Sequence, residues 1–183
     1  QTCALPIFST TNYSVGETGL AAVVTVLRQG SLMDPASVQF DTQDITAVAG
    51  LNYTNVTALV LNFATNQAST NISIGVIDDT VVNADRTVGL ALNNPTSAPS
   101  GSASLGTSSA TLTIANNDID LQFSAGTYTV GENGGFVTIS VIRTGVTNVT
   151  NTVAFATTNG TAIDGLDYLG TNGVLTFRAG DTN

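Results

Sequence analysis

The chain has very little positive charge. Its 183 residues include four Arg and no Lys or His, against 13 Asp and Glu, which gives a formal net charge of −9. Nucleic acids and anionic membrane surfaces both attract clustered Lys and Arg, so this composition argues against either as a partner. Acidic side chains with so few basic partners are instead available to a cation.

Residue types that carry catalysis or cross membranes are also scarce. There is no His to act as a general base, no Lys, no Trp and one Cys. A pair of carboxylates can hydrolyse a glycoside, but the acidic residues here fall on recurring turns rather than around one cleft. We therefore predict that the chain is not an enzyme. No apolar run approaches the roughly 18–20 residues that span a bilayer, so we predict no membrane insertion in this sequence.

The one cysteine lies in a segment that we expect to be foreign. Residues 1–7 (QTCALPI) match, codon for codon, the translation of a common sequencing-adapter tail, CAG ACG TGT GCT CTT CCG ATC. We predict that 1–7 derive from such an adapter and leave them out of the predicted fold. A native lead-in that runs from polar to apolar is the alternative. On the first interpretation, Cys3 is neither a nucleophile nor half of a disulfide.

A sequence pattern occurs twice, 115 residues apart. Residues 13–17 (YSVGE) return as 128–132 (YTVGE), and 50–53 (GLNY) return as 165–168 (GLDY). The arginine of an Arg-x-Gly triplet also returns, as Arg28 and then Arg143. A fixed period of this length predicts two copies of one small domain in tandem. We expect repeat 1 over 8–118 and repeat 2 over 119–183, with the second copy truncated at its C-terminal side.

Apolar and polar residues alternate along most of repeat 1. Short runs rich in Val, Ile, Thr and Leu are separated by Gly, Asn, Asp and Ser, and no window shows a sustained helical stripe. The predicted strands are 20–28, 37–42, 59–63, 71–77, 87–92 and 109–115, with a long loop over 93–106. This pattern predicts an all-β fold, an immunoglobulin-like antiparallel β-sandwich in each repeat. The predicted core residues are Val15, Val24, Val26, Phe40, Leu61, Phe63, Ile74, Val76, Leu90, Leu92, Leu112 and Ile114.

The repeat resembles the Calx-beta domain. That family has an aromatic-x-Val-x-Glu segment near its start, a strand ending in Arg-x-Gly, and a central Gly-Thr-Ala-x-x-Gly-x-Asp-Tyr motif, which residues 160–168 (GTAIDGLDY) match closely. The resemblance implies tandem Calx-beta domains, one complete and one truncated, from a large bacterial extracellular or surface protein. It also implies calcium as the bound ion.

Candidate metal ligands lie at the predicted strand ends. Turns at one end of such a sandwich cluster in space, and oxygen donors without His or Cys suit Ca²⁺ better than zinc or copper. In Calx-beta domains the matching positions hold calcium. The ligands implied here are Glu17, Asp78, Asp79, Asp118, Glu132 and Asp167, with Asn52, Asn83, Asp85, Asp120 and Asp164 as weaker candidates.

Repeat 1 departs from the family at several of these positions. Asn52, Asn83 and Arg86 stand where the family has acidic residues, and its terminal acidic triplet is 116–118 (NND). Fewer carboxylates lower the charge of the site, so we expect a Kd on the order of 0.1–1 mM, or no binding.

Each candidate also has a purely structural interpretation. The two glutamates, Glu17 and Glu132, suit solvated turns, and adjacent Asp side chains commonly cap turns. Tyr53 and Tyr168 suit packing, with the hydroxyl bonded near a corner of the sandwich. Arg28 and Arg143 are expected to pair with a carboxylate of the same domain.

Three functions remain open. The first is a calcium-binding, rod-forming module of a secreted or cell-surface protein, adhesive in role, in which calcium stiffens the junction over 116–120. The second is a calcium-independent spacer in an extracellular array. The third is an accessory module of an extracellular enzyme, which would need an exposed aromatic platform that a chain without Trp supplies poorly. The expected partners are neighbouring repeats and other cell-surface molecules.

Overall fold

The computed structural model describes residues 4–98 and 103–183. The chain divides into two compact units, Gln1–Asn117 and Asp118–Asn183. Each unit is described below by itself. Cys3 and its two predecessors in the predicted adapter-derived segment lie outside the described residues. No helix in the described part of the chain is long and apolar enough to span a bilayer.

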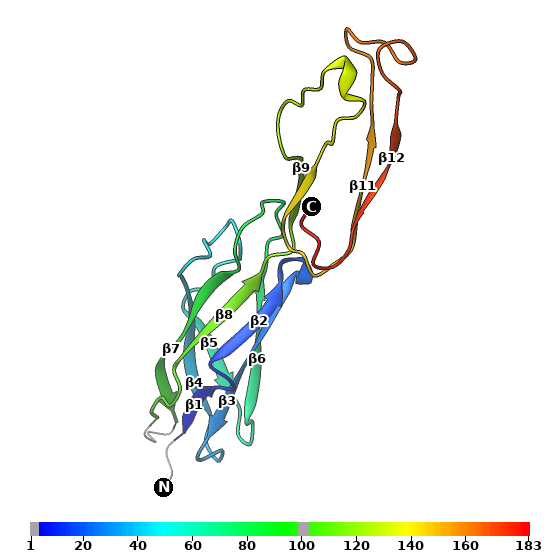
Figure 1. Ribbon diagram of the computed structural model, residues 1–183. Helices are drawn as coiled ribbons and strands as arrows, with labels where there is room; N and C mark the ends of the chain where they lie inside the picture. Colours follow the sequence, from blue (N-terminus) through cyan, green and yellow to red (C-terminus); the bar gives the residue numbers. More distant parts are fainter. Residues whose placement is uncertain (1–3, 99–102) are drawn as a thin grey trace. The chain divides into compact units, whose positions relative to one another are not determined.

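Unit 1 is a sandwich of two β-sheets (Figure 1). The smaller sheet has the order β1-β3-β6, and the larger has the order β2-β8-β7-β4-β5. The all-β sandwich predicted from the alternating pattern is therefore confirmed. Its strands are β1 (Leu5–Phe8), β2 (Asn12–Gly16), β3 (Ala21–Gln29), β4 (Ala36–Asp44), β5 (Leu59–Phe63), β6 (Ser69–Gly75), β7 (Arg86–Ser97) and β8 (Ser109–Ala115), and one 3-10 turn, η1, covers Glu17–Gly19.

Side chains from the inner faces of both sheets form the core of unit 1. On β3 the period-two alternation buries Val24 and Val26, while Val23, which faces outward, is 59% exposed. Of the predicted core residues, Val15 alone is only partly buried, and it packs against the same cluster. The others are all buried: Val24, Val26, Phe40, Leu61, Phe63, Ile74, Val76, Leu90, Leu92, Leu112 and Ile114.

Two strands near the N-terminus lie outside the predicted set. β1 pairs antiparallel with β3, from Leu5 opposite Gln29 to Phe8 opposite Val26. Residues 5–7, which we left out of the predicted fold, therefore belong to the sheet, while their origin stays a prediction. β2 pairs with β8 in parallel, which departs from the antiparallel prediction. Alternation reveals a strand but not its neighbour, and the chain passes here from one sheet to the other, so β2 enters the larger sheet alongside β8.

β7 is longer than predicted. We expected a loop from 93 onward, but β7 continues to Ser97, opposite Ala36 of β4. One extra residue of β7 is accommodated between the pairs Ser37↔Thr96 and Gln39↔Asn93, where the register shifts. Pro95 lies in this bulge, a position that tolerates a residue without an N–H donor. The turn-forming composition was therefore a sign of a bulge rather than of the end of the strand.

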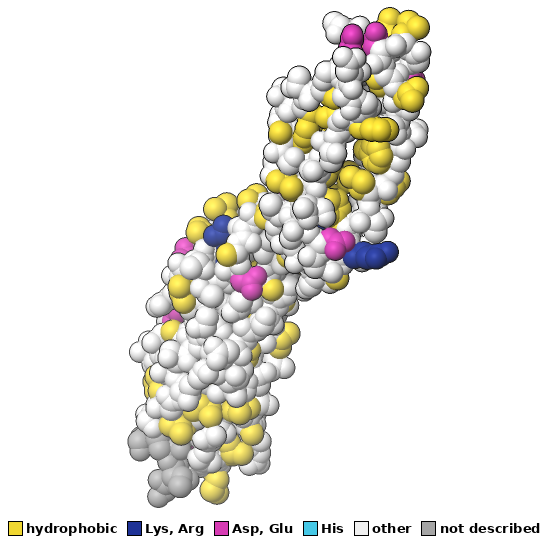
Figure 2. All heavy atoms as spheres, in the orientation of Figure 1, with side chains coloured by type: hydrophobic (Ala, Val, Ile, Leu, Met, Phe, Trp, Pro, Cys, Tyr) yellow, Lys and Arg dark blue, Asp and Glu magenta, His cyan; other side chains and the backbone are white. Residues whose placement is uncertain are grey.

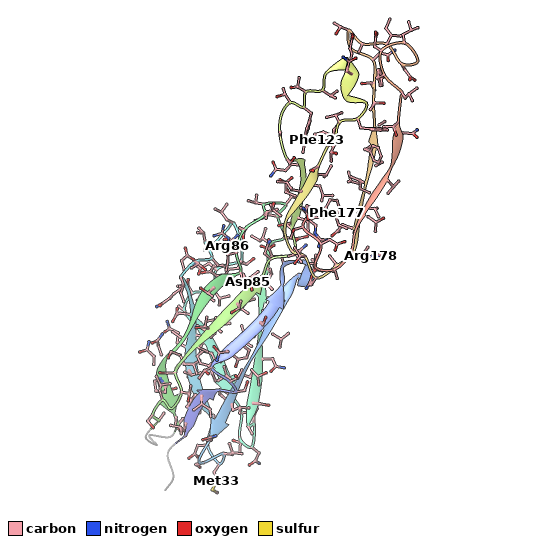
Figure 3. The ribbon with its side chains drawn as sticks, viewed as in Figure 1. Met33, Asp85, Arg86, Phe123, Phe177 and Arg178 are labelled. Carbon is pink, nitrogen blue, oxygen red and sulfur yellow. The ribbon has the colours of Figure 1, made fainter. Side chains whose placement is uncertain are left out.

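Unit 2 has fewer strands. β9 (Ile119–Phe123) pairs with β10 (Val141–Gly145), β11 (Asn151–Ala156) pairs with β12 (Asn172–Phe177), and η2 covers Glu132–Gly134. By repeat position these strands correspond to β1, β3, β4 and β5, and the described residues of unit 2 hold no counterpart of β6, β7 or β8. Apolar side chains are correspondingly exposed. Phe123, labelled in Figure 3, is 63% exposed, whereas its counterpart Phe8 is buried in the core of unit 1.

Candidate metal centre

Two carboxylates meet at the amide of Asn117. Glu17 is the first residue of η1, directly after β2, and Asn117 follows β8. The parallel pairing of Gly16 with Ala115 brings these two residues to the same end of the larger sheet, and Asp78 reaches it from the segment that follows β6. With its nitrogen turned toward the carboxylates, the Asn117 amide donates to Asp78 Oδ1 and Glu17 Oε2, each at 3.3 Å.

The opposite orientation of the same amide places its oxygen among the two carboxylates. The N and O atoms of an Asn side chain are nearly isosteric, so a turn of the amide exchanges a donor for an acceptor at one position. Asn117 Oδ1 then lies 3.3 Å from each carboxylate oxygen. Ligand oxygens around Ca²⁺, at 2.3–2.6 Å from the ion, are separated from their neighbours by roughly 3–3.7 Å. The separation of Asn117 Oδ1 from each carboxylate oxygen therefore suits neighbouring ligands of this ion.

Further oxygens nearby in the sequence lack a donor. Asn83 Oδ1 and Asn116 Oδ1 are buried and have no hydrogen-bond partner. The nitrogen of Asn83, in contrast, donates to the carbonyl of Val81 at 2.7 Å. A buried acceptor without a donor costs about 1–3 kcal/mol. Amide oxygens in this condition are chemically suited to a cation, and they are hard donors of the same kind as the carboxylate oxygens of Glu17 and Asp78.

Two other predicted candidates, and Arg86 beside them, support the local backbone. Asp79 Oδ1 accepts a hydrogen bond from the amide of Val81 at 2.7 Å, which closes a turn. Asp85 Oδ1 accepts from the amide of Asn116 at 3.1 Å and so helps to position the segment that carries Asn117. Arg86, beside Asp85 in Figure 3, donates to the carbonyl of Thr46 at 3.0 Å.

The convergence of carboxylates is smaller than the sequence predicted. Within residues 4–98 and 103–183, no three side chains of His, Cys, Asp or Glu lie close enough to hold one metal ion. Asp118 is the first residue of unit 2, where its carbonyl accepts a hydrogen bond from Val146. Asp120 on β9 and Glu132 at the start of η2 are exposed. Figure 2 shows how sparse charged side chains are on the visible face of the molecule.

Comparison with known proteins identifies the family. The Calx-beta domain matches residues 5–118 and again residues 115–183. The chain belongs to the Calx-beta family. The chain is 30% identical to the sodium/calcium exchanger Calx of Drosophila melanogaster over an alignment of 173 residues. This alignment covers 93% of the chain and 18% of the exchanger. The chain is also 27% identical to extracellular matrix protein 3 of Lytechinus variegatus, over 90% of this chain and 6% of that protein.

A solved structure supports the tandem arrangement of Calx-beta domains. The crystal structure of the calcium binding domain CBD12 of CALX1.1 is 28% identical and has a TM-score of 0.61, covering 97% of this chain and 71% of that one. The chain spans less than a fifth of the length of the two relatives named above. The predicted resemblance to tandem Calx-beta domains is confirmed, and relatives of the chain include an extracellular matrix protein.

The central Calx-beta motif forms the same loop in both repeats. Asn52 Oδ1 accepts from the amide of Val48, and Asp167 Oδ2 accepts from the amide of Ile163, both at 2.9 Å. Asn52 is buried and Asp167 is exposed. In each repeat the side chain before the tyrosine thus stabilises its own loop by a hydrogen bond to the backbone. Asp164, another candidate, likewise accepts from a backbone amide, that of Gly170.

The tyrosine of the motif anchors this loop from within. Tyr53 is fully buried, and its hydroxyl donates to Asp44 Oδ1 at 2.7 Å. Burial, with the bond to Asp44, raises the pKa of Tyr53 to about 12. In repeat 2 the hydroxyl of Tyr168 donates to Asn159 Oδ1 at 2.8 Å. The predicted packing role is confirmed for Tyr53, whereas its partner Asp44 was absent from our sequence candidates.

The arginines of the two Arg-x-Gly triplets bind backbone carbonyls. Arg28 is 3% exposed and donates to the carbonyls of Ala64, Ser31 and Asp34. Arg143 is 2% exposed and donates to the carbonyls of Val149, Thr147 and Arg178 and to the side chain of Asn151. The expected carboxylate partner is thus replaced by loop carbonyls, because the guanidinium carries five donors that can satisfy several acceptors at once.

Asn117 is the site residue that sequence reasoning did not select. The signal was present, because it occupies the middle of the segment that is acidic in the Calx-beta family. The sequence pattern alone indicates that the asparagines there are lost ligands. The structure shows instead that the amide of Asn117 lies between the two remaining carboxylates.

Proposed function

We propose that the chain is a pair of Calx-beta repeats that serves as a calcium-responsive, rod-forming module of a large extracellular or cell-surface protein. The observation that carries this proposal is the convergence of the Glu17 and Asp78 carboxylates on the side-chain amide of Asn117 at the end of unit 1. The role is structural rather than catalytic, in keeping with a chain that has no His or Lys.

Calcium is the ion that suits this donor set. All three groups can offer hard oxygen donors, and none of them is a His or Cys side chain of the kind that favours a transition metal. Two carboxylates give a low site charge, for which we expect a Kd on the order of 0.1–1 mM, as in other extracellular modules. A bound ion would neutralise Glu17 and Asp78 and hold the ends of β2, β6 and β8 together.

The position of the site in the chain suggests how calcium would act on a rod. Asn117 is the last residue of unit 1, and Asp118 is the first residue of unit 2. Fixing the side chain of Asn117 restricts the backbone next to it, so ion binding reduces the freedom of the junction.

The relatives support the setting. One is a sodium/calcium exchanger, one solved relative is described as a calcium binding domain, and another relative is an extracellular matrix protein. Adhesion by the parent protein and its bacterial origin follow from the sequence resemblance and remain predictions.

Calorimetric calcium titration of the 183-residue chain, with thermal melts in calcium and in chelator, tests the proposal. We expect binding in the millimolar range and a higher melting temperature in calcium, because a ligand that binds the folded state stabilises it. Glu17→Gln removes a ligand charge and should abolish the shift, while the matched change Glu132→Gln, in the exposed counterpart, should leave it intact. Absence of heat and of any melting shift in the wild type would contradict the calcium role.

A calcium-independent spacer is the second candidate. It is favoured by the replacement of family acids with Asn52, Asn83 and Arg86, and by the ability of the Asn117 nitrogen to satisfy both carboxylates. Small-angle scattering of the chain in calcium and in chelator separates the two. Equal scattering curves in both conditions favour the spacer. A larger maximum dimension of the molecule in calcium than in chelator favours the stiffened rod.

A further inference from the structure

We infer that the amide of Asn117 is an internal substitute for the cation: its nitrogen holds Glu17 and Asp78 together without calcium, and its oxygen becomes a ligand when calcium binds. This inference rests on the proposed calcium site. It adds a residue-level device that lets one site exist in an ion-free and an ion-bound form.

The nitrogen-facing orientation of the Asn117 amide suits the ion-free form. Glu17 is 1% exposed, and one of its oxygens and one oxygen of Asp78 lie within 3.3 Å of the same Asn117 atom. Two carboxylates this close repel each other, and burial of Glu17 strengthens the repulsion. The Asn117 nitrogen carries two N–H donors, one for each carboxylate, so the amide satisfies both acceptors at once.

The ion-bound form needs only a rotation of the amide. Turning the side-chain amide by half a turn replaces the nitrogen by Oδ1 at 3.3 Å from both carboxylate oxygens. No backbone movement is required, because the two ends of the amide have nearly the same shape. Asn117 is exposed, so the rotation meets no buried barrier. Calcium therefore competes with two hydrogen bonds, and the site binds it less tightly than a carboxylate at this position would allow.

The inference predicts a trade-off at residue 117. An aspartate there supplies an additional ligand charge but has no donor, so three carboxylates meet when calcium is absent. We expect Asn117→Asp to bind calcium at least about tenfold more tightly, in line with the effect of ligand charge on such sites. In chelator the same variant should melt about 4–8 °C lower than the wild type, the shift expected for the loss of one favourable contact in a domain of this size.

The experiment compares melts and titrations of the 183-residue wild type, N117D and N62D. Asn62 lies on β5 opposite Ser37, at the other end of the larger sheet, so N62D adds the same charge away from the site. A low melting temperature of N117D in chelator that calcium restores, with no such change in N62D, supports the inference. Equal chelator melts of N117D and N62D overturn it.

A second readout follows the amide directly. In ¹⁵N-labelled wild type, the side-chain N–H₂ signals that disappear in N117D belong to Asn117. Movement of these signals on adding calcium supports the rotation, and unchanged signals under saturating calcium overturn it. If the wild type takes up no calcium but N117D still melts lower than N62D in chelator, the proposed function fails while the donor role of Asn117 stands. The two failures are therefore distinguishable.

Discussion

Glu17 and Glu132 occupy the same turn in the two repeats but different environments. The glycines before them have almost the same backbone angles, φ −78° and ψ 153° at Gly16 and φ −77° and ψ 151° at Gly131. Glu17 is nonetheless buried, whereas Glu132 is exposed. The comparison teaches that a local sequence suffices to form the 3-10 turn, while burial of its glutamate depends on segments distant in the chain.

The distant segments are those that follow β5. In unit 1 they supply Asp78 and Asn117 beside Glu17, and three strands that cover the core. The described residues of unit 2 hold only the counterparts of β1, β3, β4 and β5. Side chains that depend on local partners should therefore behave alike in the two units, and those that depend on the later strands should not.

The largest difference is expected for core aromatics. Phe40 is fully buried, and the centroid of its ring lies 6.2 Å from that of Phe8. The counterpart of Phe40 in repeat 2, Phe155, is only half-buried. We expect Phe40→Ala to lower the free energy of unfolding of unit 1 by about 3–5 kcal/mol, because it leaves a cavity. Denaturant unfolding of the full chain, followed by hydrogen exchange within each unit, measures this. Phe155→Ala should cost clearly less, and equal costs would contradict the comparison.

A smaller cost, equal in the two units, is expected for the buried arginines. Arg28→Met and Arg143→Met each leave several loop carbonyls without donors, which should cost about 2–3 kcal/mol of unfolding free energy. The acceptors come from loops present in both units. The same unfolding measurements apply, with the exposed Arg178, labelled in Figure 3, changed to Met as the neutral control. A loss confined to Arg28 would show that the arginine also depends on the later strands.

Tyr53→Phe should cost about 1–2 kcal/mol, because it removes the hydroxyl bond to Asp44. The effect should depend on pH. The pKa of Tyr53 is raised to about 12 by folding from an ordinary value of 10, so the folded state favours the protonated phenol. This contribution is complete below pH 10 and is lost as pH rises toward 12. Thermal melts between pH 9 and 12 should show a decline in wild-type stability.

The control for this pH dependence is the variant itself. Above pH 10, the melting temperature of Tyr53→Phe should fall less steeply with pH than that of the wild type, because the variant has no hydroxyl to ionise at this position. An identical decline in the variant would assign the pH dependence to other groups.

The smallest effect is expected for Asp167→Asn. Asn52 already shows that an amide oxygen can accept the bond from the backbone amide four residues earlier, at the same 2.9 Å. Because Asp167 is exposed, we expect a change within about 0.5 kcal/mol. Hydrogen exchange at the Ile163 amide is the direct measurement. Loss of protection there would show that the carboxylate charge is needed to hold this loop.

The sequence predicted much of the fold because the relevant signals are local. The alternation in β3 and the loop around Tyr53 depend on residues close together in the chain. The parallel pairing of β2, the bulge at Pro95 and the carbonyl partners of Arg28 depend on which strands become neighbours. For the metal centre, the sequence identified Glu17 and Asp78, but the role of Asn117 appeared only when β2 and β8 were paired.

By itself, the sequence determined the repeat and the positions of most strands of unit 1, since period-two alternation acts over a few residues. The tertiary structure alone decided which carboxylate is buried, which strands run in parallel and which amide lies between Glu17 and Asp78. These properties arise from contacts between residues as much as 100 positions apart. Such contacts form only when the two sheets pack together, and no local pattern encodes them.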